Sequence, residues 1–133
     1  MNDLTALERD VMQMLLNGDD PVLAILREQL RVATVSERKM TGVGFHTHFS
    51  VPPTTSRVLE NPSFEIGDIA AQVQGVQHGA GFLLFVRDGF LSFLEGFTYD
   101  EPWPEQITKY ELAYINGRRD WNELRKKLHG NSR

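Results

Sequence analysis

Two of the four histidines in this 133-residue chain lie two positions apart, at His46 and His48, in the segment GVGFHTHFSVPP. Side chains at positions i and i+2 of a β-strand point to the same side, so two such imidazoles can bind one divalent metal ion. The residues that follow, Phe-Ser-Val-Pro-Pro, supply no acidic third ligand. The alternative interpretation is that the two histidines form the polar edge of a strand.

Glu95 is a carboxylate within the otherwise apolar segment FLSFLEGF. A carboxylate among apolar neighbours needs a partner or has a raised pKa, and such groups gather at functional sites. His78, Glu95 and Tyr99 therefore form a candidate pocket. A metal-binding protein or small enzyme would use His46, His48, His78 and Glu95 together. The alternative is a structural carboxylate that accepts hydrogen bonds from Tyr99, His78 or nearby backbone N–H groups.

A third group is the acidic turn DEPWPE, with Asp100, Glu101, Trp103 and Glu105. Its indole stands between two prolines and among carboxylates. Exposed tryptophans of this kind are frequent in protein-binding hot spots. These four residues are a candidate interaction surface. The alternative is a tryptophan that packs over one end of a sheet.

The composition limits the classes of function. There are no cysteines, which excludes disulfides, thiolate catalysis and cysteine-bound zinc. Residues 1–115 carry 16 acidic and 8 basic side chains, whereas residues 116–133 carry 2 and 6. An acidic body repels phosphates, so we expect no nucleic-acid partner. With no signal peptide and no long apolar run, we expect no membrane association and a cytoplasmic location.

The chain begins with a pattern typical of two helices. Thr5 and Glu8 have the spacing of a capping box at the start of a helix over residues 5–17. A second helix begins at Pro21, capped by one of the two aspartates before it. An N-terminal helical hairpin is therefore predicted.

After Ala33 the apolar residues repeat every second position, as in strands. Asp120 and Glu123 then have capping-box spacing before a last helix. We predict one α+β domain over residues 1–133, with an N-terminal helical hairpin, an antiparallel β-sheet of five or six strands, and a C-terminal helix. The expected strands are residues 33–39, 41–51, 64–73 with a bulge at Gly67, the two arms of a hairpin within 79–97, and 107–115.

The hairpin over residues 79–97 is the strongest local pattern. Asp88-Gly89 between two apolar runs predicts a two-residue type I′ turn. A continuous ladder from this turn pairs Leu84 with Phe93 and Phe82 with Glu95. Both faces of the hairpin are largely apolar, so we expect it at the centre of the sheet, covered at least in part on both sides.

The chain resembles a family of small bacterial proteins of unknown function. The resemblance implies a single bacterial cytoplasmic domain and no established activity. It is carried by four segments: LLNGDDPVLAILREQL, TGVGFHTHFSVP, HGAGFLLFVRDG and LEGFTYDEPWP.

Taken together, these features favour a small non-enzymatic protein-interaction module without a cofactor. One form is an immunity or antitoxin-type protein, whose acidic surface covers a basic partner. The alternative is the metal-binding protein or enzyme built on the histidines and Glu95, for which a divalent metal is the expected cofactor. A third interpretation is a homodimer formed through an exposed apolar sheet face.

Overall fold

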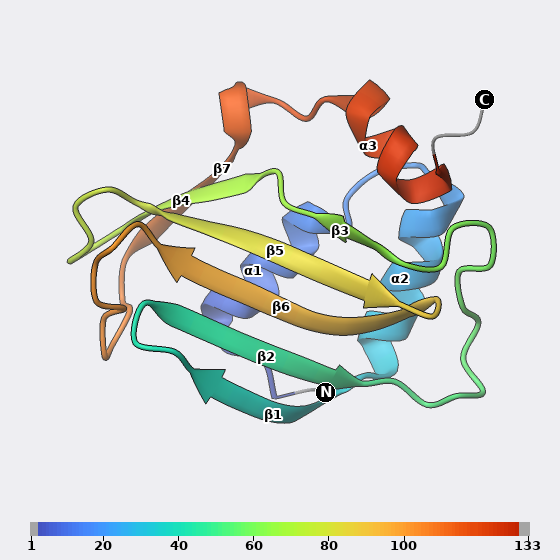
Figure 1. The fold of residues 1–133 in the computed structure, drawn as a ribbon, viewed down its shortest axis with the longest axis horizontal. Helices are drawn as coiled ribbons and strands as arrows, with labels where there is room; N and C mark the ends of the chain where they lie inside the picture. The colour runs from blue at the N-terminus through green and yellow to red at the C-terminus, as the bar shows by residue number, and fades with distance from the viewer. Residues whose placement is uncertain (1–2, 131–133) are drawn as a thin grey trace.

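A computed structural model of the chain describes residues 3–130 and shows an antiparallel sheet with helices on one side (Figure 1). Helices α1 (Ala6–Leu15) and α2 (Pro21–Val32) lie behind the sheet, and α3 (Trp121–His129) lies beyond its β3 edge. Among residues 3–130, no helix is both long and apolar enough to cross a membrane. The strands are β1 (Thr34–Met40), β2 (Gly44–Ser50), β3 (Phe64–Ile66), β4 (Ile69–Val73), β5 (Ala80–Arg87), β6 (Phe90–Thr98) and β7 (Tyr110–Tyr114), and a 3₁₀ turn covers Ile115–Gly117.

The sheet order is β1-β2-β6-β5-β4-β7, with β3 also paired to β5. Every pair is antiparallel, which confirms the predicted α+β class and the central place of the hairpin. The described sheet has seven strands because the segment predicted as one bulged strand is two strands, separated at Gly67 and Asp68. The break lets β3 and β4 pair with different parts of β5.

The predicted helical hairpin is confirmed in detail. The Thr5 hydroxyl accepts the Glu8 N–H while the Glu8 carboxylate accepts the Thr5 N–H, which completes the capping box. Asp20 caps α2, and Pro21 is its first residue. The apolar sides of both helices pack on the sheet through a core in which Val11, Met12, Leu15, Leu23 and Leu26 are fully buried.

The predicted register of the central hairpin is wrong beyond the first two pairs. Positive φ angles at Asp88 and Gly89 confirm the turn. The register then shifts between Phe85 and Val86, because β6 contains one extra residue at Ser92. Phe93 therefore pairs with Phe85, whereas a continuous ladder would have paired Phe93 with Leu84.

This bulge changes the face on which Glu95 lies. Glu95 pairs with Leu83, not with Phe82 as predicted, and it shares its face with Phe93. Leu91 and Leu94 point to the helices and are buried. The bulge thus keeps Leu91 and Leu94, on either side of Ser92, in the core, and it turns Glu95 away from the core.

The helices are joined to the sheet by a buried ion pair. The Glu8 carboxylate accepts two hydrogen bonds from the Arg38 guanidinium, at 2.6 and 2.8 Å, and one from the Thr47 hydroxyl. Burial alone would raise the pKa of Glu8, but the hydrogen bonds from Arg38, Thr47 and the Thr5 N–H outweigh it and lower the pKa. The pair ties α1 to β1 and β2.

Two more buried polar side chains join distant segments. The Gln29 amide on α2 donates to the carbonyls of Ser56 and Gly89 and accepts the Leu91 N–H, which holds the tip of the β5–β6 hairpin. The Arg119 guanidinium pairs with Asp68 and donates to carbonyls at the end of α1. These bonds satisfy groups that would be costly to bury alone.

Removing the cation of the buried pair should destabilise the protein. Arg38→Met leaves the Glu8 carboxylate, which is 2% exposed, without its partner, so we expect the free energy of unfolding to fall by about 3 kcal/mol at neutral pH. Folding lowers the pKa of Glu8 in the wild type. The difference in free energy of unfolding between wild type and Arg38→Met is therefore present above the unfolded-state pKa of about 4.3 and shrinks as the pH falls. Urea unfolding at several pH values measures both effects.

The matched control is Lys39→Met, which removes an exposed cation from the same strand. We expect a change within about 0.5 kcal/mol for it. Equal losses for the two variants would show that the buried pair contributes nothing particular to stability.

His129 fixes the end of α3. Its Nδ1 lies 2.8 Å from the Glu60 carboxylate and its Nε2 lies 2.7 Å from that of Asp20, the cap of α2. Both ring nitrogens can donate only in the protonated imidazole. The hydrogen bonds to Glu60 and Asp20 accordingly raise the pKa of His129.

The His129 contacts predict a pH-dependent stability. Folding raises the pKa of His129. The contribution of His129 to the stability of the fold is therefore complete below the unfolded-state pKa of about 6.5, and it is lost as the pH rises through the folded-state pKa. We expect the melting temperature of wild type to exceed that of His129→Gln most at about pH 5.5 and least at about pH 9. A difference that is constant or grows with pH would contradict the assignment.

Candidate functional site

The side of the sheet turned away from α1 and α2 is named here the outer face. Figure 1 shows β2, β6 and β5 at its centre with no helix of residues 3–130 in front of them. Alternation along the strands decides which side chains it presents. They are His46 and His48 from β2, Phe93, Glu95 and Phe97 from β6, and Gly81, Leu83, Phe85 and Arg87 from β5.

A row of stacked groups crosses the outer face over three strands. The rings of Phe85 and Phe93 stack with centroids 4.2 Å apart and planes 13° apart. His48 stacks on the other side of Phe93 at 5.0 Å, and the Arg87 guanidinium lies 5.0 Å from the Phe85 ring centroid. The aromatic row is therefore His48, Phe93, Phe85 and Arg87, and the three rings are all half-buried.

His46 and Glu95 form a partly open polar contact beside this row. They are register partners on β2 and β6, and His46 Nε2 lies 3.4 Å from the Glu95 carboxylate. Their side chains are 35% and 30% exposed. The Glu95 carboxylate therefore lies at the rim of the core beside His46, and within residues 3–130 it forms no hydrogen bond with Tyr99 or His78.

The outer face continues along β6 to Tyr99. Gly81 on β5 pairs with Phe97, and a Cβ at Gly81 would come within 2.7 Å of the Phe97 ring. The glycine thus lets that ring lie close over β5. Tyr99 packs edge-on against Phe97 at 5.7 Å and is 54% exposed.

His78 stands apart from the other predicted ligands. It lies in the turn before β5, where its N–H donates to the Glu101 carboxylate at 2.7 Å. Glu95 pairs with Leu83, and the extended stretch of β5 from Ala80 to Leu83 alone spans about 10 Å. Within residues 3–130, no group of three or more histidine, aspartate or glutamate side chains is arranged to hold a metal ion.

The acidic turn has a structural part and an exposed part. The Glu101 carboxylate accepts the N–H groups of Gln77 and His78, and these bonds lower the pKa of Glu101. Trp103 packs edge-on against Phe45 at 5.2 Å and closes one end of the sheet, as the alternative interpretation expects. Asp100 and Glu105 are exposed, so two carboxylates of the predicted interaction surface are open to solvent.

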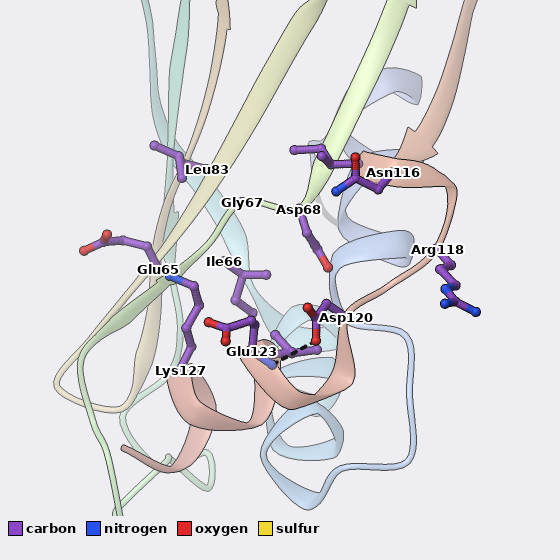
Figure 2. A pocket seen from close by; sticks show the side chains of 12 residues that line it. Glu65, Ile66, Gly67, Asp68, Leu83, Asn116, Arg118, Asp120, Glu123 and Lys127 are labelled. Carbon is purple, nitrogen blue, oxygen red and sulfur yellow. Dashed lines mark hydrogen bonds between the residues drawn. The ribbon is translucent and has the colours of Figure 1, made fainter. Parts of the chain in front are cut away.

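A pocket of about 300 Å³ lies between the β3 edge and α3 (Figure 2). Leu83 lines it together with Gly67. Several carboxylates also line it, but they have structural roles: Asp120 accepts the Glu123 N–H at the start of α3, and Asp68 pairs with Arg119. The sequence gives no signal for this pocket because its walls are about fifty residues apart in the chain.

Comparison of the chain with models of protein families, with curated proteins and with solved structures found no match. The residues that sequence reasoning missed are Phe85, Arg87 and Phe93, which the predicted register distributed over two faces.

Proposed function

We propose that the chain is a small non-enzymatic protein-interaction module that binds through its outer face. The observation that carries the proposal is the aromatic row, which lies at the centre of a sheet face that no described helix covers. Contiguous apolar patches on a protein surface mark binding sites, whereas scattered apolar residues do not.

The composition of the outer face supports this proposal. Aromatic and arginine side chains carry most of the binding energy at protein interfaces, and Phe85, Phe93 and Arg87 stand together at the centre. Charged pairs surround them: Glu65 lies 4.0 Å from Arg87, and Glu37 lies 4.0 Å from Lys39 on the edge strand. An apolar centre with a charged rim is typical of protein-binding surfaces.

Charge and solvation favour an interaction module over an enzyme. Catalytic groups work in water-excluded sites, whereas the His46–Glu95 pair is about one-third open to solvent. The acidic body, with 16 acidic and 8 basic side chains in residues 1–115, favours a basic partner protein. Immunity or antitoxin-type binding is the form of interaction that this charge fits.

The decisive variant removes one ring of the aromatic row. Phe93→Ser should weaken binding of a partner protein at least about thirty-fold, because the ring stacks on both sides within the proposed hot spot. The matched control is Leu59→Ser, which removes an apolar side chain that is 76% exposed on the β2–β3 loop. Affinity capture from extracts of the source cells identifies the partner, and titration of the purified partner by calorimetry gives the affinities.

Both variants should show wild-type circular dichroism. The proposal predicts that the captured protein binds wild type and Leu59→Ser alike and loses Phe93→Ser. A partner that binds all three with equal affinity would exclude the outer face as its binding surface.

A further inference from the structure

The strands of the outer face present more negative than positive charge. Register and alternation place two permanent cations on it, Lys39 and Arg87, and four carboxylates. The carboxylates are Glu37, Glu65, Glu95 and Glu111. Lys39 lies 4.0 Å from Glu37, and Arg87 lies 4.0 Å from Glu65. Within residues 3–130, neither Glu95 nor Glu111 pairs with a lysine or an arginine.

Glu95 is the unmatched carboxylate at the centre of the face, whereas Glu111 lies on β7 at the edge of the sheet. The Glu95 side chain is 30% exposed and contacts the His46 imidazole, which carries a charge only when it is protonated. A protein that covers the outer face removes water from this carboxylate, and that loss is costly unless the protein supplies a cation in its place. Glu95 therefore calls for a cationic group from the partner.

Aromatic rings flank Glu95 on both sides along β6. Phe93 and Phe97 are two residues away in either direction, and side chains at this spacing lie about 6.7 Å apart on one face of a strand. Both rings are half-buried. A cation above the carboxylate is therefore within reach of both rings, since cation–π contacts extend to about 6 Å from the ring centroid.

The outer face already holds one arginine between a ring and a carboxylate. The Arg87 guanidinium lies 5.0 Å from the Phe85 ring centroid and 4.0 Å from the Glu65 carboxylate. A planar guanidinium can stack on a ring while it donates hydrogen bonds to a carboxylate, whereas an ammonium group offers only a point charge. The surroundings of Glu95 therefore favour an arginine over a lysine.

The neighbouring strands leave the approach to Glu95 open beside Phe97. Both register partners of Phe97 are glycines, Gly44 on β2 and Gly81 on β5. The Phe97 ring lies so close over Gly81 that a Cβ there would come within 2.7 Å of it. These two strand positions carry no side chain that would stop a guanidinium from reaching Glu95.

We propose that the partner of the outer face anchors an arginine side chain on Glu95, with its guanidinium between the rings of Phe93 and Phe97. The arginine supplies the cation that the carboxylate lacks. The partner is then a basic protein that presents this arginine next to apolar side chains, which pack on the aromatic row. The inference rests on the proposed function, because it names the group by which the same face recognises its basic partner.

A small arginine probe tests the anchor without the partner. N-acetyl-arginine amide carries the guanidinium, and N-acetyl-citrulline amide is its neutral analogue of nearly the same shape. NMR titration of the side-chain signals of His46, Phe93 and Phe97 should give a millimolar dissociation constant for the arginine probe, at least about fivefold below that for the citrulline probe. Sodium chloride added to the citrulline samples matches the ionic strength, because salt screens such contacts.

The preference for the arginine probe should depend on one carboxylate. Glu95→Gln should abolish it, because the amide keeps the shape of the side chain and loses its charge. The matched control Glu111→Gln makes the same change at the other unmatched carboxylate, on the β7 edge, and should keep the fivefold preference. Circular dichroism and thermal unfolding confirm that both variants are folded.

Three results would overturn the anchor: no detectable binding of the arginine probe, equal binding of the two probes, or a preference that survives Glu95→Gln. Any of these, together with a partner protein that is still lost with Phe93→Ser, overturns the anchor and leaves the proposed function standing. A partner protein whose affinity is unchanged by Phe93→Ser overturns the proposed function, whatever the two probes show.

Discussion

The register of the central hairpin is the constraint on which the rest of the structure depends. One extra residue at Ser92 allows Leu91 and Leu94 to enter the core and sends Phe93 and Glu95 to the other side. Without the bulge, one part of β6 would present the wrong face, because a shift of one residue inverts every side chain. The aromatic row and the His46–Glu95 pair exist only in this register.

The polar contacts behind the sheet keep this arrangement in place. Gln29 bonds to the hairpin tip next to the bulge, and the Glu8–Arg38 pair holds α1 against β1 and β2. Both helices are thereby committed to one side of the sheet. The other side keeps half-buried rings at its surface, which is why we propose it as the binding surface.

Local patterns in the sequence were sufficient to predict the helices, strands and turns, but not to predict which side chains meet on the outer face. The capping box at Thr5, an aspartate cap before Pro21 and the Asp88-Gly89 turn act over a few residues, and all were predicted. The bulge was not predicted, because no residue type in FLSFLEGF requires it and only packing against the helices selects it. Glu95 was therefore assigned to the wrong row, and the row of Phe85, Phe93 and His48 could not be anticipated.

Hydroxyl-radical footprinting of the wild-type chain, read by mass spectrometry, tests the register of the central hairpin most directly. Phe85 and Phe93 should be oxidised, because their rings are half-buried on the outer face, while the buried Leu91 and Leu94 should be protected. Oxidation of Leu94 with protection of Phe93 would contradict this register.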